Sequence, residues 1–370
     1  MRAFGQLAHN PAAGRVEVHA PGFVEPDPAD LPLVRRIFES YRRMKADQRT
    51  AGGVYLPSSL WQQQLDSAYS SLNEGLERDD LAPFHHFLAN FGAWERYTGV
   101  TWSTLIRGSA GSALKRRHLE NEVFLRQARI WQWFYGGRRP IAALRQPAHG
   151  NQLGAHVDGE FLTVSSFPIE VYGNLLAQLL DGHQRPVVAE LGGGYGIQAY
   201  YLLSQRGPAS YVDFDLPETL CLAAYYLAKC FPERRLLLYG EADYSPALHE
   251  EYDLLFMPSF VMERLASDSV TLFVNEFSLG EMTSEAARNF VSHIARSAEY
   301  FFHVNHDRVP NVYGGDARGL LGFEYPVPAD RFVQLFRYPE LFHMINRGFL
   351  NFSSDTFAYL YGRRLAHHGE

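Results

Sequence analysis

A glycine-rich segment offers the clearest chemistry in the sequence. The stretch VVAELGGGYGIQAYYLL has the pattern of a buried strand that ends in Glu190, a tight turn and then a helix. The turn contains Gly192, Gly193, Gly194 and Gly196, and glycine lets the backbone approach a ligand closely. The spacing is G-x-G-x-G, with Ile197 where a dinucleotide-binding turn would have its third glycine, which disfavours NAD and FAD. The turn therefore predicts a ligand site of another kind.

A second acidic residue follows the turn at a useful distance. The strand SYVDFD ends at Asp215, 19 residues after Gly196, where a carboxylate can accept hydrogen bonds from both hydroxyls of a ribose. An alternative stays open, because Asp215, Pro217 and Glu218 also match the N-cap, first-turn proline and capping-box acid of the next helix. The two roles are compatible, since a carboxylate has several acceptor positions.

Short apolar runs alternate with helical patterns in the second half of the chain, which is typical of a parallel sheet with crossover helices. Seven strands are expected: RPVVAEL, ASYVDFD, RLLLYG, YDLLFMPS, SVTLFVNEF, YFFHVNHD and DTFAYLYGRR. A helical pattern runs over 283–298, and the first part of the chain is expected to be helical around 33–46, 58–76, 83–91 and 113–134. We place a boundary near residue 160, which gives an N-terminal helical region (1–160) and a core (161–370) with an irregular insertion at about 306–350.

Several segments resemble a known family. The E-x-G-x-G-x-G turn followed by a strand-ending acid resembles class I S-adenosylmethionine-dependent methyltransferases. More closely, VDFDLPETLCLAAYYL, LFVNEFSLGEM and FFHVNHDR look like the sugar O-methyltransferases of natural-product and glycan pathways, over roughly residues 161–307. The resemblance implies an α/β, Rossmann-like core with a seven-stranded, mostly parallel sheet, and S-adenosylmethionine as cofactor.

The resemblance also implies roles for single residues. Glu190 is expected to face the methionine amino group of the cofactor, with the glycine turn and Asp215 holding the rest. Asp243, in YGEAD, resembles the acid that receives the adenine amino group, although a solvated loop acid is an alternative. We also assign Ser259 to the cofactor site, and we expect its strand to end on the far side of the point where the strand order reverses.

Transfer of a methyl group to a hydroxyl requires a base near the reacting atoms. His306 is the first choice because a neutral histidine accepts a proton near pH 7, and Glu281 is the second. His306 could instead order its loop, and Glu281 could anchor substrate or favour the start of the next helix. Asn275 and Asn305, also at strand ends, are assigned to sugar hydroxyls, with loop backbone as the alternative partner.

Composition limits the classes of partner. The net charge of −7 argues against a nucleic-acid partner, and no apolar run approaches the ~18 residues that span a bilayer. Without a signal-peptide pattern, the expected location is the cytoplasm. No metal is expected, since His303 and His306 point to opposite faces of a strand. The prediction is an O-methyltransferase of a small-molecule sugar or glycoside, whose N-terminal region covers the active site or forms a homodimer contact. The alternatives are a phenolic or polyketide acceptor, or a non-catalytic partner subunit.

Overall fold

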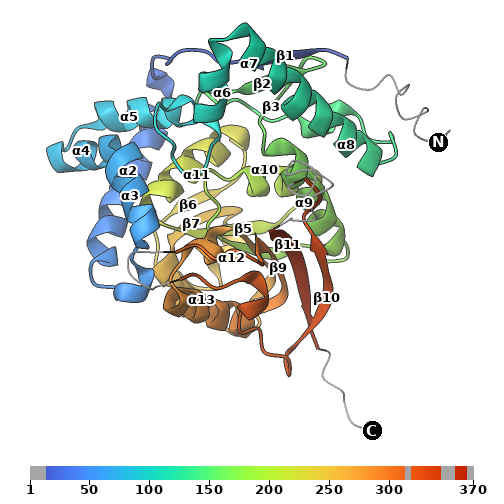
Figure 1. Ribbon diagram of the computed structural model, residues 1–370. Helices are drawn as coiled ribbons and strands as arrows, with labels where there is room; N and C mark the ends of the chain where they lie inside the picture. The colour runs from blue at the N-terminus through green and yellow to red at the C-terminus, as the bar shows by residue number, and fades with distance from the viewer. Residues whose placement is uncertain (1–13, 313–317, 343–354, 365–370) are drawn as a thin grey trace.

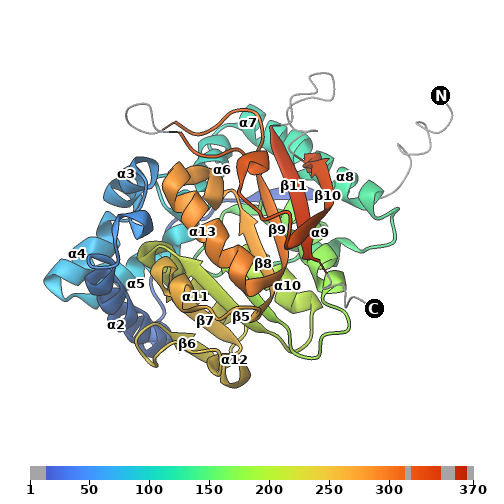
Figure 2. The ribbon, with the colours of Figure 1, turned by 90° about the horizontal axis from the view of Figure 1, so that it is seen from below.

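A mixed sheet with helices on both faces forms the centre of the molecule (Figure 1). The computed structural model describes residues 14–312, 318–342 and 355–364 of the chain. In these ranges the sheet has eight strands, in the order β10-β11-β9-β8-β4-β5-β7-β6, which can be followed in Figure 2. The six strands from β9 to β6 are parallel, and their bounds are Val187–Leu191 (β4), Ser210–Asp215 (β5), Leu236–Leu238 (β6), Leu254–Pro258 (β7), Val270–Glu276 (β8) and Ala298–His306 (β9).

The strand order reverses next to β4. The chain first runs outward from β4 to β5, β6 and β7, and then returns to β8 on the other side of β4. In open parallel sheets, such a reversal leaves a crevice at the carboxyl ends of the two diverging strands, and ligands bind there. The carboxyl ends of β4 and β8 therefore mark the expected ligand site.

The Rossmann-like fold class and the N-terminal helical region are confirmed, and all seven predicted strands are present. The eighth strand, β10 (Phe332–Pro339), lies in the stretch 306–350 that the sequence led us to expect as an irregular insertion. β10 pairs antiparallel with β11 (Thr356–Arg363), which pairs antiparallel with β9. The sequence of β10, FVQLFRYP, is rich in apolar residues, but as an edge strand with one partner it leaves Val333 and Leu335 exposed. The prolines in and around it led us to expect an irregular segment instead. Residues 313–317 and 343–354 of that stretch lie outside the described residues.

Two sets of helices cover the faces of the sheet. Residues of α9 (Ser166–Leu179), α10 (Ile197–Gln205) and α11 (Pro217–Cys230) join one hydrophobic cluster with alternate strand residues. Those of α12 (Leu248–Glu251) and α13 (Ser284–Ser297) join a second cluster on the opposite face. The helix predicted over 283–298 is confirmed as α13, which Thr283 caps by accepting the Ala286 N–H at 3.3 Å. None of the described helices is long and apolar enough to cross a membrane.

The N-terminal region is mostly helical, as predicted. Its helices are α2 (Leu31–Gln48), α3 (Ser59–Ala68), α4 (Ser70–Arg78), α5 (Leu81–Asn90), α6 (Ser103–Ala110), α7 (Ala113–His118) and α8 (Arg126–Phe134), with a π-helical segment, η4 (Leu119–Leu125), between the last two. The helix expected over 58–76 is divided at Tyr69, which is fully buried and donates its hydroxyl to Thr98 O.

A small sheet of β1 (Val16–His19), β2 (Gly154–Val157) and β3 (Glu160–Leu162) was not expected from the sequence. Residue 160 begins β3, which pairs with β2. Side chains of α2 and α5 also share one hydrophobic cluster with α11. The N-terminal helices therefore pack directly on the core, and the division near residue 160 stays a prediction.

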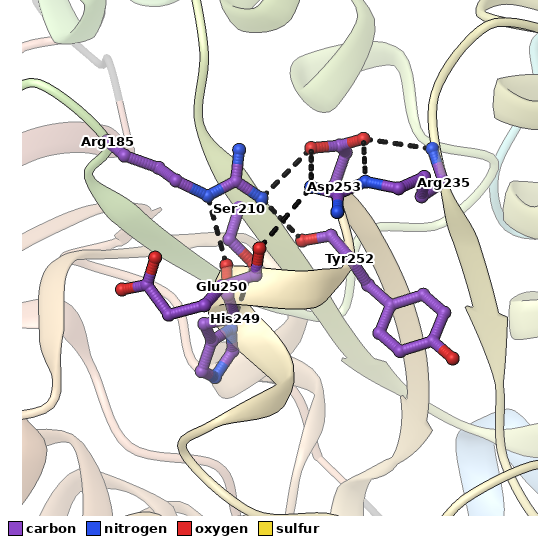
Figure 3. Close-up of polar contacts among 7 residues, drawn as sticks. All are labelled: Arg185, Ser210, Arg235, His249, Glu250, Tyr252 and Asp253. Atoms are coloured by element: carbon purple, nitrogen blue, oxygen red, sulfur yellow. Dashed lines mark hydrogen bonds and ion pairs between the residues drawn. The ribbon is translucent and has the colours of Figure 1, made fainter.

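An ionic network holds the amino ends of the parallel strands (Figure 3). Asp253, just before β7, accepts hydrogen bonds from the Arg185 guanidinium at 2.9 Å and from the Arg235 backbone N–H at 2.9 Å. Nearby, the His249 ring lies between the hydroxyls of Ser210 and Tyr244, each 2.9 Å from a ring nitrogen. Burial and the Arg185 charge lower the pKa of His249 to about 4, so the ring is neutral near pH 7. This network lies at the amino ends of the strands, whereas the glycine turn lies at the carboxyl end of β4.

Candidate active site

The glycine turn joins the end of β4 to the start of α10, as predicted. Gly192 has φ +80°, and a Cβ there would collide with the Ser278 side chain. A Cβ on Gly193 would come within 2.7 Å of the Asp213 carboxylate. Both positions therefore require glycine. Gly192, Gly193 and Gly194 are partly exposed, so their backbone is accessible to a ligand.

Three carboxylates project from β4 and β5 on the same face of the sheet. Glu190 is paired in register with Asp213, and Asp215 is two residues further along β5. Asp213 accepts the Gly193 N–H at 3.2 Å, and Asp215 accepts the Gly194 N–H at 3.1 Å. The two aspartates therefore hold the turn, and Asp215 remains partly exposed beside it.

The capping alternative for Asp215 is wrong in its details. Leu216, and not Asp215, is the N-cap of α11, and the Asp215 carboxylate accepts the Leu216 N–H at 2.6 Å. Pro217 does occupy the first turn, but Glu218 binds Lys45 at 2.7 Å instead of closing a capping box. Lys45 belongs to α2, so a tertiary ion pair has taken the acid that the local pattern assigned to the cap.

The three carboxylates carry no compensating charge. None of them forms an ion pair with a residue in the described ranges. Burial, opposed by a hydrogen bond from the Tyr211 hydroxyl at 2.6 Å, raises the pKa of Glu190 to about 7, and the Asp215 charge adds to the rise. Burial also raises the pKa of Asp215 to about 6 and that of Asp213 well above its ordinary value. The site therefore favours a ligand that brings positive charge.

Glu281 lies where the N-terminal region reaches the core. It ends a short 3-10 turn (Ser278–Glu281), and the Trp61 indole N–H donates to its carboxylate at 2.8 Å. The Ser58 hydroxyl donates to the Glu281 backbone carbonyl at 2.9 Å. Burial and the Asp215 charge raise the pKa of Glu281 to about 7, although the Trp61 bond lowers it. Glu281 and Asp215 thus belong to one site, with α3 over it.

The segment around Val100 completes this contact. Val100 Cγ1 lies 3.2 Å from the Cβ position of Gly194, and Gly99 lies against the Trp61 ring. The Tyr97 ring is 41% exposed, and the pKa of its hydroxyl is raised by burial and by the Glu281 charge. Val100 and Trp61 of the N-terminal region therefore contact the glycine turn and Glu281, respectively. The predicted role of this region in covering the active site stays a prediction.

His306, at the end of β9, forms a pair that the sequence did not reveal. Its Nδ1 lies 2.8 Å from a carboxylate oxygen of Asp355, and no described residue binds its Nε2. The other Asp355 oxygen accepts the N–H groups of Arg308 and Val309 at 2.8 and 2.9 Å. Asp355 is 5% exposed, so the imidazole is held by an anchored carboxylate while Nε2 stays available.

Phe277 connects His306 to the rest of the site. Its φ is +66°, an uncommon conformation for a bulky residue, and its N–H donates to Val304 O at 2.8 Å. Its ring centroid is 6.0 Å from that of His306, and Ser278 follows it against Gly192. The predicted base and the glycine turn are therefore linked through two consecutive residues, Phe277 and Ser278, with Glu281 three positions after Ser278.

Asn275 and Asn305 are completely buried and bind one another at 2.9 Å. Asn275 also donates to Leu191 O at 2.8 Å, and Asn305 accepts the Gly280 N–H at 3.1 Å. In this structure both amides hold loop backbone at the ends of β8 and β9, which was the alternative role. Contact with a sugar stays a prediction for both residues.

The strand order changes the positions of Asp243 and Ser259. We expected the strand before Ser259 to lie on the far side of the reversal, and this is wrong, because β7 pairs with β5, with Asp215 opposite Pro258. Ser259 is 6% exposed and lies next to the Asp215 edge. β7 also separates β5 from β6, which places the exposed Asp243 one strand further away. The cofactor roles of both residues stay predictions.

No group of three histidine, cysteine, aspartate or glutamate residues in the described ranges is arranged to hold a metal ion. The carboxylates at the glycine turn instead bind backbone N–H groups and a tyrosine hydroxyl.

Comparisons with known proteins give fold neighbours only. No protein-family model matches the sequence, and no curated protein matches it. Similar solved structures include the magnesium protoporphyrin IX methyltransferase of Synechocystis PCC 6803 with bound SAH. The match has 13% identity and a TM-score of 0.36, and it covers 54% of this chain and 85% of that chain. Another is the mitomycin 7-O-methyltransferase MmcR, with 10% identity and a TM-score of 0.35 over 54% of this chain and 56% of that chain. A third is the [4+2]-cyclase SpnF, with 14% identity and a TM-score of 0.35 over 53% of this chain and 80% of that chain. At these levels of similarity, none of them assigns a reaction or a substrate to this chain.

Proposed function

We propose that this chain is an S-adenosylmethionine-dependent methyltransferase. The observation that carries the proposal is the glycine turn at the reversal of strand order, with its backbone partly exposed and the carboxylate of Asp215 beside it. The same surroundings hold Glu190 and Asp213, which have no cation within the described residues. S-adenosylmethionine carries a sulfonium and an ammonium group, so its charge suits this site.

The residues present fit the cofactor. The backbone of Gly192, Gly193 and Gly194 is partly exposed, and the partly exposed Asp215 is expected to bind the ribose hydroxyls. Glu190 is expected to lie near the ammonium group. Ser259, at the adjacent strand end, is better placed for this site than Asp243. When bound, the cofactor supplies a methyl group on a positively charged sulfur.

We further propose a hydroxyl group as the acceptor, because the His306–Asp355 pair provides a base. Asp355 holds Nδ1 and fixes the ring, so Nε2 can take the hydroxyl proton as the oxygen bonds to the methyl carbon. The Asp355 carboxylate would stabilise the imidazolium, and the cofactor would supply the methyl group and keep the electron pair of the former carbon–sulfur bond on sulfur. Glu281 is the second candidate base, since a carboxyl with a pKa of about 7 also exchanges protons near neutrality.

A sugar is the acceptor that the surrounding residues favour. The partly exposed rings of Tyr97 and Trp61 lie beside the Glu281 carboxylate. Aromatic rings pack against the apolar faces of sugars, and a carboxylate accepts hydrogen bonds from their hydroxyls. A phenolic acceptor would use the rings but would offer few donors to Glu281.

Calorimetric titration of S-adenosylhomocysteine tests the cofactor. We expect micromolar binding, and none for NAD under the same conditions. Transfer of labelled methyl groups from S-adenosylmethionine to a panel of sugars, glycosides and phenols then tests the acceptor. If folded protein binds no S-adenosylhomocysteine, the non-catalytic subunit becomes the better account. If it binds the cofactor but methylates only phenols, the sugar assignment is wrong and the methyltransferase assignment stands.

A further inference from the structure

Positive charge is concentrated in one part of this acidic chain. Residues 101–139 contain eight lysine or arginine residues and two glutamates, a net charge of +6, whereas the whole chain has −7. Four consecutive residues of this segment, Lys115, Arg116, Arg117 and His118, form the last turn of α7 and are all exposed. This charge lies on helices of the N-terminal region, which form the top of the molecule in Figure 1.

A hollow opens next to this turn, with a volume of about 530 Å³. Its lining includes the basic side chains of Lys115, Arg117 and His118, and the neutral hydrogen-bonding groups of Ser109 and Asn121. Glu122 supplies a carboxylate to the described lining. Sites for small molecules commonly have volumes of this size.

The walls of the hollow are fixed by specific contacts. The Arg116 guanidinium donates to the Ala110 carbonyl through Nε at 3.2 Å and through a second nitrogen at 2.5 Å, which ties α7 to the end of α6. On the other side, Leu119 and Phe124 anchor the π-helical segment η4 in a hydrophobic cluster. Wide π-helical turns are rare in proteins, and many of those that do occur lie at functional sites. Here the turn brings Asn121 and Glu122 to the hollow.

The basic side chains of the hollow are not neutralised by ion pairs. Neither Lys115 nor Arg117 forms a salt bridge with a residue in the described ranges. Some arginines elsewhere are paired, such as Arg318 with Glu324 at 2.8 Å and Arg337 with Asp307 at 2.6 Å. The hollow thus combines two cations that have no ion pair within the described residues, a histidine, two neutral polar groups, the apolar side chain of Leu114 and one carboxylate, that of Glu122.

We propose that this hollow binds a phosphate-bearing ligand. A phosphate group offers several acceptor oxygens and up to two negative charges, which matches a lysine, an arginine and neutral donors better than a single carboxylate would. The His118 ring can add a further N–H donor. The ligand can be a soluble phosphate ester or the headgroup of an anionic lipid, because both present the same group. This site is separate from the glycine turn and does not depend on the proposed methyl transfer.

The test compares two double variants of the full chain. Lys115→Gln/Arg117→Gln removes the two charges of the hollow, and Arg35→Gln/Arg49→Gln removes two exposed charges on α2 and just after it. The first probe is inorganic pyrophosphate, which has no adenosine part for the glycine turn, measured by calorimetry. The second is sedimentation with vesicles of equal parts phosphatidylglycerol and phosphatidylcholine, against vesicles of phosphatidylcholine alone.

We expect the hollow variant to weaken binding of at least one probe by about tenfold or more, and the control variant to change it by less than about twofold. Loss of pyrophosphate binding assigns a soluble phosphate ester. Loss of binding to the anionic vesicles alone assigns a lipid headgroup. The proposal is overturned if the wild-type chain binds neither probe, or if both double variants lose binding equally. Unchanged thermal unfolding of the variants would show that they are folded.

Discussion

Replacing Glu190 with glutamine is expected to stabilise the ligand-free protein and to weaken cofactor binding. Glu190 is 2% exposed, and burial with the Asp215 charge raises its pKa from 4.5 to about 7. In the unfolded chain the Glu190 carboxyl ionises near pH 4.5, whereas in the folded protein it stays protonated up to about pH 7. The free energy of unfolding therefore falls as pH rises from about 4.5 to 7 and is constant at higher pH. This pKa difference lowers the free energy of unfolding by about 3 kcal/mol at pH 8 and by under about 1 kcal/mol at pH 5.

Glutamine removes this penalty and keeps an acceptor for the Tyr211 hydroxyl, which donates to Glu190 at 2.6 Å. Urea unfolding should therefore show Glu190→Gln to be more stable than the wild type by about 3 kcal/mol at pH 8, with a much smaller gain at pH 5. Calorimetry should show S-adenosylhomocysteine binding at least about tenfold weaker, since a charge facing the ligand is lost.

Asp253→Asn is a matched control, because we expect this change to lower the free energy of unfolding, whereas Glu190→Gln should raise it. Although burial raises the pKa of Asp253, hydrogen bonds from Arg235 and Arg185 lower it from 3.8 to about 2. This stability is present above pH 3.8 and is lost as pH falls through 2, so Asp253→Asn should lose about 2 kcal/mol at both pH 5 and pH 8. The reasoning about Glu190 would be refuted if Glu190→Gln were no more stable than the wild type at pH 8, or if its gain did not shrink at pH 5.

Four further outcomes are expected. Asp215→Ala should weaken S-adenosylhomocysteine binding by at least about tenfold, and calorimetry that finds unchanged affinity would limit the residue to holding the turn. With an acceptor found by screening, His306→Ala should slow methyl transfer by ~10²-fold or more with cofactor affinity unchanged; Asp355→Asn should slow it less and shift its pH profile, and near-normal rates in both would move the base elsewhere. Trp61→Phe should lower turnover, whereas Trp131→Phe, which removes another indole that donates to a glutamate, should not; equal effects would exclude a local role for the first. Treatment with EDTA should leave the methylation rate unchanged, and loss of activity that magnesium restores would contradict this.

Local patterns were sufficient for the centre of the fold. β4, the glycine turn and β5 follow one another in the sequence, and each has its own signal: a buried apolar run, positive-φ glycines and a strand-ending acid. The order of parallel strands has no such signal, because long crossovers can place a strand on either side of its predecessor. For this reason the sequence indicated that β7 exists but not that it lies between β5 and β6.

Residues that act across long sequence separations were also missed. Asp355 is 49 positions from His306, and the two meet only because β11 pairs antiparallel with β9, with Thr356 opposite His306. Trp61 reaches Glu281 across 220 positions, through packing of the N-terminal helices on the core. An isolated aspartate or tryptophan carries no local mark of such a contact, so only the tertiary structure reveals it.

Buried carboxylates have opposite electrostatic surroundings at the amino ends and at the carboxyl ends of the parallel strands. At the amino ends, Asp253 is matched by two arginines, and its lowered pKa shows that ionisation there favours the fold. At the carboxyl ends, Glu190 and Glu281 have raised pKa values, so their ionisation opposes the fold near neutral pH. A cationic ligand would relieve part of this cost, so cofactor binding should be stronger at a pH where the acids are ionised. The carboxylates that make the ligand-free site unfavourable are thus the groups that would select a positively charged ligand.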